Sequence, residues 1–456
     1  MTSPNNPDLN DTIVAISTPP GRGGIGIVRL SGPDARAVAA PLLQLRHPLA
    51  AGQARFAHII DTSDSEVLDE AVVTFFEAPN SYTSEDIVEI AAHGSPVLLD
   101  YLLRASLRNG ARLAEPGEFT QRAFLSGRLD LTQAEAVRDL IESTTLHQAR
   151  LAAQQLGGAL SRQIAPIKEK LVHLIAALEA GIDFAEDDID LLPASEIAAQ
   201  IEAIAAPLTA LEQTFAYGRI VRDGFTLAIV GRPNAGKSSL FNRLVERDRA
   251  IVTAAPGTTR DLVTERVSLD GIPVELVDTA GLRDAIDEAE SLGIAKSREA
   301  MAEADIVLLV RDATQPLHRE DEAAISAHAD RPLLIALNKR DLAPQAALPA
   351  SAHPIISTSA LTGEGISELR RAILATLSAA APTSETALLT NLRQQQAVSG
   401  TVAALARAQQ ATAASIPHEM LLLDLYEALQ SLDALTGVTT TDDILRLIFS
   451  TFCIGK

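Results

Sequence analysis

The apolar positions of the chain follow three patterns in succession, and the first covers residues 1–126. Short apolar runs alternate there with turn residues, which is typical of strands. The predicted strands are 12–16, 26–30, 71–76 and 87–90. Residues 19–24 are rich in Gly and Pro and predict a turn, whereas residues 95–107 have helical spacing. The first segment is therefore predicted to be an α+β domain.

Helical spacing dominates from about residue 130. A long helix is predicted over 164–182, where apolar residues recur three or four apart, and a second from about Ala194 to Phe215. The same spacing returns near the C-terminus, in a leucine stripe over 421–432 and a last helix over 442–451. We expect one helical domain that is interrupted by an insertion. Its two parts are residues 127–220 and residues 381–456.

Residues 221–380 alternate short buried strands with helical segments. The predicted strands are 225–230, 274–277, 306–310, 333–337 and 354–356. This alternation is typical of an α/β fold with a largely parallel sheet. The predicted fold class is thus multidomain, with an N-terminal α+β domain and a helical domain that is split by an inserted α/β domain.

A glycine-rich loop follows the first strand of the inserted domain. Residues 231–238 read G-x-x-x-x-G-K-S and precede a helical segment, which is the setting of a phosphate-binding P-loop. Lys237 is predicted to reach the β- and γ-phosphates, and Ser238 to place its hydroxyl on Mg²⁺. The residues predicted to bind the nucleotide here are Asn234, Ala235, Gly236, Lys237, Ser238 and Ser239.

Two further motifs lie where the switch segments of a GTP hydrolase would follow the P-loop. Thr258 and Thr259 lie in a polar loop, where a hydroxyl can complete the Mg²⁺ shell. Asp278 ends a predicted strand and can hold Mg²⁺ through water, while Gly281 lets a backbone N–H approach the γ-phosphate. These motifs, together with the P-loop, predict that the inserted domain is a P-loop GTPase domain.

The last two motifs select the base. Asn338, Lys339 and Asp341 follow a buried strand, and the Asp341 carboxylate can accept hydrogen bonds from guanine N1–H and its 2-amino group. Adenine offers neither donor. Ser359 and Ala360 can present a backbone N–H to guanine O6. All these motifs in this order predict GTP binding and hydrolysis.

The residue that orients the attacking water departs from a common pattern. Many small GTPases carry Gln directly after D-x-x-G, but this chain has Leu282, which cannot orient water. Glu290 is the candidate replacement. The alternative is that Glu290 is a solvent-facing carboxylate on a helix.

Composition narrows the class of protein. The formal net charge of −21 argues against coating nucleic acid through bulk positive charge, although it leaves room for a local basic patch. Cys453 is the single cysteine, so no intramolecular disulfide can form, which fits a reducing compartment. No signal peptide, transit peptide or apolar stretch of about 18 residues is recognisable. We expect a cytoplasmic protein without a membrane span.

Motifs at both ends of the chain indicate a family. The P-loop, the Gly-Thr-Thr-Arg-Asp loop at 257–261, residues 18–24 and the terminal Phe-Cys-Ile-Gly-Lys together resemble the MnmE/TrmE-type tRNA-modification GTPases. The resemblance implies an N-terminal folate-binding and dimerisation domain, a homodimer, and a heterotetramer with the FAD-dependent subunit MnmG (GidA). It also implies that the complex adds an aminomethyl-type group at C5 of the wobble uridine of certain tRNAs, with the one-carbon unit from a tetrahydrofolate derivative.

The resemblance also assigns roles to individual residues. Potassium would be bound by Asn234, Thr253, Ala255 and Thr258, and magnesium by Ser238 and Thr259. Glu290 would orient water. Folate would be bound by Arg29, Glu89, Arg128 and Lys456, although relatives often carry Lys where Arg128 stands. In this picture the two arginines face the glutamate carboxylates of the folate, and Glu89 faces its pterin.

Two alternatives stay open. Cys453 matches a terminal cysteine implicated in the modification chemistry, but a lone cysteine is also commonly a small core residue. The chain as a whole could instead be a GTP-driven assembly switch, such as a ribosome-biogenesis GTPase, that makes no covalent product.

Overall fold

The computed structural model describes residues 11–183, 192–245, 264–278, 304–327, 331–345, 351–377 and 387–438, together with residues 452, 453 and 455. The chain divides into two compact units. The first comprises residues 1–138 and 433–456, so both ends of the chain belong to it. The second comprises residues 139–432.

A seven-stranded sheet forms the centre of the first unit, in the order β3-β4-β5-β6-β2-β1-β7. Its strands are β1 (Ile13–Ile16), β2 (Gly23–Ser31), β3 (Leu43–Leu45), β4 (Ala54–Ile60), β5 (Val67–Phe76), β6 (Ile87–Gly94) and β7 (Arg112–Leu113). Neighbouring strands are antiparallel except β1 and β7. The four predicted strands are confirmed, and β3, β4 and β7 were not predicted.

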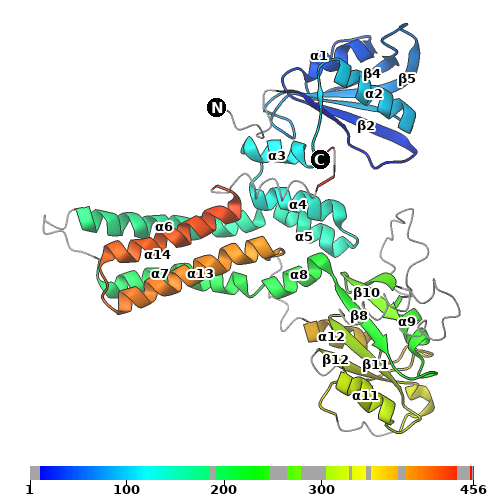
Figure 1. Cartoon of the computed structure of the whole chain (residues 1–456), viewed down its shortest axis with the longest axis vertical. Helices are drawn as coiled ribbons and strands as arrows, with labels where there is room; N and C mark the ends of the chain where they lie inside the picture. Colours follow the sequence, from blue (N-terminus) through cyan, green and yellow to red (C-terminus); the bar gives the residue numbers. More distant parts are fainter. Residues whose placement is uncertain are drawn as a thin grey trace. The chain divides into compact units, whose positions relative to one another are not determined.

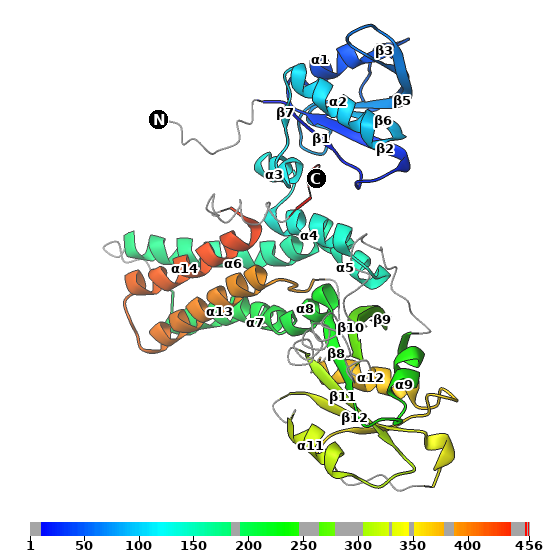
Figure 2. The same cartoon turned by 45° about the vertical axis from the view of Figure 1, so that its right-hand side comes forward.

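Helices α1 (Ala35–Ala39) and α2 (Pro96–Arg108) cover one face of this sheet (Figures 1 and 2). Alternate residues of β2 face them: Val28 and Leu30 are fully buried, whereas Ile25 is 67% exposed. Gly26 allows the close approach of α2, because a Cβ there would lie 2.5 Å from Leu99 Cδ1. Two further helices, α3 (Glu118–Leu125) and α4 (Leu131–Glu142), follow the sheet along the chain.

Helices from before and after the inserted domain form the helical part of the second unit. They are α5 (Leu146–Leu156), α6 (Ala159–Asp183), α7 (Ala194–Glu212), α8 (Phe215–Asp223), α13 (Leu392–Ala413) and α14 (His418–Thr436). Their apolar stripes face one another: Ile201 and Leu208 of α7 and Leu405 of α13 are fully buried. Figures 1 and 2 show α6, α7, α13 and α14 side by side. Helices from before and after the inserted domain therefore pack together, as predicted.

The inserted α/β domain contains a six-stranded sheet in the order β13-β12-β11-β8-β10-β9. Its elements are β8 (Phe225–Val230), α9 (Lys237–Val245), β9 (Thr264–Leu269), β10 (Ile272–Asp278), β11 (Ile306–Asp312), α11 (Arg319–Ala327), β12 (Leu333–Asn338), β13 (Ile355–Ser357) and α12 (Ile366–Leu377). All neighbours are parallel except β9, an antiparallel edge strand that was not predicted. The predicted fold class is confirmed.

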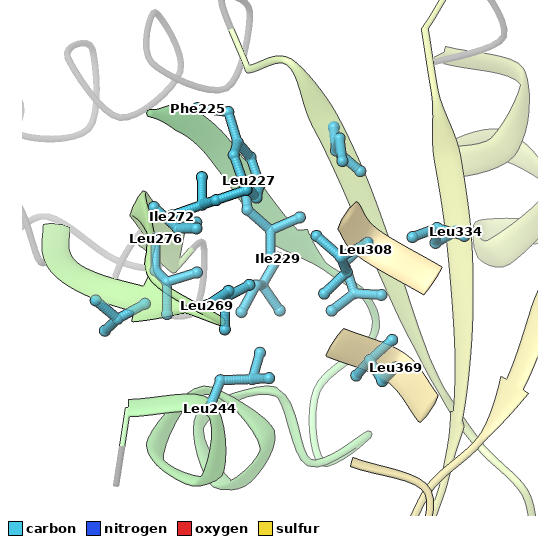
Figure 3. Close-up of a cluster of buried hydrophobic side chains, with 14 of the residues drawn as sticks. Phe225, Leu227, Ile229, Leu244, Leu269, Ile272, Leu276, Leu308, Leu334 and Leu369 are labelled. Carbon is cyan, nitrogen blue, oxygen red and sulfur yellow. The ribbon is translucent and has the colours of Figure 1, made fainter. Parts of the chain in front are cut away.

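Leucine, isoleucine and phenylalanine side chains fill the space between this sheet and helices α9 and α12. Figure 3 shows Leu227 and Ile229 of β8 facing Leu244 of α9 and Leu369 of α12. These four side chains are fully buried. Burial of this size stabilises the domain by about 2 kcal/mol per side chain. It holds β8 and α9 in place on either side of the P-loop.

Candidate functional site

Two glycines shape the loop between β8 and α9. Gly231 has a φ of 147°, and a Cβ there would lie 2.3 Å from the Val310 carbonyl oxygen. Gly236 has a φ of 93°, and a Cβ there would lie 2.3 Å from Asn338 Nδ2. Both positions need glycine for conformation and for space. This requirement explains why the motif has glycine at each end.

The charged and hydroxyl groups of the P-loop lie around the start of α9. Lys237 Nζ donates to the carbonyl oxygens of Gly231, at 2.9 Å, and Arg232, at 3.0 Å. Ser238 and Ser239 are exposed in the first turn of the helix. The positive end of the helix dipole adds to the Lys237 charge, which favours an anion such as phosphate.

Asn338 joins three of the predicted motifs. Its side chain is 1% exposed, and its Nδ2 donates to the Ala235 carbonyl oxygen at 3.1 Å. Its Oδ1 accepts the backbone N–H of Ala360 at 3.0 Å. The P-loop, the Asn338–Asp341 motif and the Ser359–Ala360 motif are therefore assembled by one buried amide.

Ser359 holds the carboxylate that is predicted to read the base. The Ser359 Oγ donates to Asp341 Oδ1 at 2.6 Å. The Ser359 Oγ also accepts the backbone N–H of Thr362 at 3.1 Å. Ser359 itself is fully buried. The Asp341 carboxylate is thus held in one orientation, as selective recognition of a base requires.

Several predicted residues lie outside the part of the chain that the structure describes. They are Thr253, Ala255, Thr258, Thr259, Gly281, Glu290 and Lys456. Asp278 ends β10, and only its backbone is described. It pairs in register with Ile229 of β8, so β10 ends beside the strand that leads into the P-loop.

A second cluster of predicted residues lies in the first unit. Arg29 of β2 and Glu89 of β6 are partners in the strand register. The carboxylate oxygen Oε1 of Glu89 accepts from Arg29 Nε at 2.8 Å and lies 2.7 Å from Nη2. The Arg29 guanidinium also lies over the rings of Tyr82, at 5.8 Å, and Phe119, at 5.6 Å. The two residues predicted to bind folate therefore form an ion pair with each other. Glu89 partly neutralises the Arg29 charge, so Arg29 would attract a folate carboxylate less strongly than the sequence suggested.

The end of the chain contacts this pair. The Gly455 carbonyl oxygen accepts from Ser17 Oγ at 3.1 Å and from Arg29 Nη1 at 3.5 Å. The Cys453 carbonyl oxygen accepts the backbone N–H of Gly117 at 3.4 Å, and Cys453 is exposed. We call these contacts of Cys453 and Gly455 with Ser17, Arg29 and Gly117 the tail clamp. An exposed cysteine favours a chemical role over the alternative of a small core residue.

Arg128, the remaining described folate candidate, is exposed directly after α3. Burial raises the pKa of the Tyr82 phenol, and the Thr120 hydrogen bond and the charges of Arg29 and Arg128 oppose this rise. Arg128 thus acts electrostatically on the same tyrosine as Arg29.

Sequence reasoning missed Ser17 and Gly117. Neither belongs to a motif that carries chemistry, and both act on residues at the far end of the chain. Ser17 does directly precede residues 18–24, which were singled out, so proximity to that motif is the one available signal.

Comparison with known proteins agrees with this geometry. A family model described as the GTP-binding protein TrmE N-terminus matches residues 12–128, and one described as the MnmE helical domain matches residues 131–453. This chain belongs to the MnmE family. Three relatives bear the name tRNA modification GTPase MnmE. The Koribacter versatilis protein is 60% identical over 98% of this chain and 100% of its own length. The MnmE proteins of Chloroflexus aurantiacus and Geotalea uraniireducens are 43% and 41% identical, again over 98% of this chain and 100% of their own length.

The match to these MnmE relatives thus extends over nearly the whole chain. Among the residues that the structure describes, no helix is long and apolar enough to cross a membrane.

Proposed function

We propose that this chain is a potassium-dependent GTP hydrolase that acts with an FAD-dependent partner. Together they would add an aminomethyl-type group at C5 of the wobble uridine of certain tRNAs. The tail clamp is the observation that carries this proposal, because it holds the terminal segment that contains the exposed Cys453 against Ser17, Arg29 and Gly117. A pure assembly switch has no need of such an arrangement.

The nucleotide site supports the hydrolytic half. Lys237 would bind the β- and γ-phosphates, and the hydroxyls of Ser238 and Thr259 would hold Mg²⁺, which prefers oxygen ligands. Asn234 is exposed in the P-loop, and its amide oxygen would be a ligand of the monovalent cation. Thr253, Ala255 and Thr258 would complete the potassium site. A cation there supplies positive charge against the phosphates in the transition state.

Water activation would fall to Glu290. The side chain of Leu282 has no polar atom, so the position directly after D-x-x-G cannot orient the nucleophile. A carboxylate can accept a hydrogen bond from water and so align it with the γ-phosphate.

The first unit would bind the tetrahydrofolate derivative that supplies the one-carbon unit. Glu89, held by Arg29, can accept hydrogen bonds from the amino groups of a pterin. Arg128 and Lys456 would attract the glutamate carboxylates of the folate. Cys453 would take part in the modification chemistry itself.

Assembly would complete the enzyme. One face of the seven-stranded sheet carries the exposed apolar side chains Ile25, Phe56 and Val72, of which Phe56 and Val72 are cross-strand partners. Such a face suits a second copy of the chain, as in the homodimer that we propose. The FAD-dependent MnmG subunit would complete a heterotetramer in the cytoplasm and would supply much of the tRNA-binding surface, because this chain has a net charge of −21.

Exchange of potassium for sodium tests the hydrolytic half. We expect GTP turnover to fall at least about tenfold in sodium, because one charge that stabilises the transition state is lost. Asn234→Ala should lower turnover in potassium to the same level and leave turnover in sodium unchanged. Turnover per chain should rise with protein concentration, since two α/β domains act together. Equal rates in the two salts would contradict the proposal. Mass spectrometry of wobble uridines from cells with and without the protein tests the modification half.

A further inference from the structure

An ion pair joins the base-binding motif to the end of the central strand β11. Lys339 Nζ lies 2.7 Å from Asp312 Oδ2. The Asp312 side chain is 11% exposed and the Lys339 side chain 31% exposed, so the carboxylate is largely shielded from water and the lysine is partly shielded. Asp312 belongs to none of the nucleotide-binding motifs in the sequence.

Both oxygens of Asp312 are in use. Oδ1 accepts the backbone N–H of Thr314 at 2.9 Å and the Thr314 hydroxyl at 2.7 Å, while Oδ2 accepts from Lys339. Burial raises the pKa of the Asp312 carboxyl, but the hydrogen bonds from Lys339 and Thr314 lower it by more than burial raises it. The pKa therefore lies below its ordinary value of 3.8. The carboxylate is therefore charged and held in one orientation at neutral pH.

Lys339 is fixed at its backbone as well as at its ammonium group. Its φ is 63°, a left-handed conformation that is uncommon for a residue other than glycine. Its neighbours Asn338 and Asp341 are held by Ala235 and Ser359 respectively. The Lys339 Cε lies 4.0 Å from the position of a Cβ on Gly236. The alkyl stem of Lys339 thus passes beside the P-loop, between the residues predicted to bind phosphate and base.

We propose that Asp312 is a positioning residue for guanine nucleotides. By holding the Lys339 ammonium, it keeps the alkyl stem extended as an apolar wall against which the base and ribose pack. Without that ion pair the ammonium is free to leave, and each nucleotide that binds must then order the side chain, which costs affinity. The proposal rests on the GTP binding proposed above and adds a residue to it.

A purely structural role for Asp312 predicts a different result. Asp312 also begins the turn over 312–315, where Gln315 N–H bonds to its carbonyl oxygen at 3.2 Å. Asp312→Asn keeps the shape and the Oδ1 acceptor for Thr314 but removes the charge that holds Lys339. This substitution therefore separates nucleotide positioning from support of the turn.

The experiment measures the affinity of the full-length chain for a fluorescent GDP analogue. Asp312→Asn should weaken binding about tenfold, the effect of losing about 1.4 kcal/mol. GTP turnover at saturation should stay unchanged, and so should the unfolding midpoint. Asp305→Asn is the matched control, because Asp305 precedes the same strand at its other end and accepts the Thr226 N–H. That control should bind like the wild type.

A double-mutant cycle with Lys339→Met decides the mechanism. Lys339→Met should weaken binding to a similar extent, and adding Asp312→Asn to it should cause no further loss. Wild-type affinity in Asp312→Asn, or losses that add in the double variant, would overturn the positioning role. A wild-type chain that binds no GDP would instead overturn the proposed GTP binding, so the two failures are distinguishable.

Discussion

Arg122 and Glu118 form the most buried ion pair described in the first unit. Each side chain is 1% exposed, and Arg122 Nη2 lies 3.0 Å from Glu118 Oε1. Arg122 also binds Glu85 and Asp11, and Glu118 also binds Arg112. Buried charges of this kind are tolerated only when each has partners. The network ties α3, and so the Gly117 end of the tail clamp, to the rest of the unit.

Glu118 should make the stability of the chain depend on pH. Burial raises its pKa, but bonds from Arg112, the Glu115 N–H and Arg122 lower it below the ordinary value of 4.5. The stabilisation is therefore present above pH 4.5 and is lost as the pH falls through the lowered pKa. Glu118→Gln should destabilise the first unit by about 3 kcal/mol at pH 7.

Urea unfolding at two pH values checks this prediction. The difference between wild type and Glu118→Gln should shrink on going from pH 7 to about pH 3. Glu115→Gln is the matched control, because Glu115 is exposed three residues away, and it should show little effect at either pH. A difference that is the same at both values would show that Glu118 is not charged in the folded protein.

At this scale, residues within local motifs were predictable and residues that act at long range were not. Gly231, Gly236 and Asn338 belong to sequence motifs with fixed spacing, and the chemistry of these motifs can be inferred from the amino-acid sequence alone. Ser17 contacts a residue 438 positions away, and Asp312 forms an ion pair with Lys339, which directly follows the adjacent strand β12. No local pattern marks either contact.

At the scale of elements, helix α5 holds both connections of the inserted domain. Gln148 Nε2 donates to the Arg222 carbonyl oxygen at 2.6 Å, at the end of α8. Gln155 Nε2 donates to the Leu388 carbonyl oxygen at 2.9 Å, in the returning connection. The two glutamines are seven residues apart and so lie on one face of the helix. The entering and leaving segments of the α/β domain are thereby fixed to the same element.

Gly218 of α8 lets these two connections run side by side. A Cβ at this position would lie 2.1 Å from the Leu389 carbonyl oxygen. Gly218→Ala should therefore destabilise the second unit by about 2 kcal/mol, although alanine favours helices more than glycine does. Urea unfolding measures the effect.

Gly400 of α13 provides the matched control. A Cβ there would lie 3.2 Å from Ser431 Oγ, the end of a side chain that can rotate away. Gly400→Ala should thus be close to neutral or stabilising, by up to about 1 kcal/mol. Equal stability changes in the two variants would contradict the close contact at Gly218.

Elements with strong periodicity were the most predictable. The helix predicted over 164–182 is α6, Ala159–Asp183. The helix predicted from about Ala194 to Phe215 is α7, Ala194–Glu212, which ends three residues earlier than predicted, and α8, which begins at Phe215, was not predicted. Thr214 lies between them, where its hydroxyl donates to the Leu211 carbonyl oxygen and accepts the Leu389 N–H. The break depends on a contact with the returning connection, which periodicity cannot reveal.

At the scale of the whole molecule, the chain combines a guanine-nucleotide site in one compact unit with the tail clamp and the exposed Cys453 in the other. The order of motifs predicted the nucleotide site, and the resemblance at both chain ends predicts a folate site that includes Arg29 and Glu89. The internal pairing of Arg29 with Glu89 could not be predicted, because it depends on the register of β2 and β6. Our central claim is that both sites serve one reaction on tRNA.

Mass spectrometry of wobble uridines tests this claim most directly. In cells that lack this protein, the aminomethyl-type group at C5 should be absent from the affected tRNAs, and the wild-type chain should restore it. Cys453→Ser should restore none, while the purified variant keeps wild-type GTP turnover, because the thiol lies outside the nucleotide site. Unchanged wobble uridines in the deletion cells would contradict the account, and full restoration by Cys453→Ser would contradict the role of the thiol.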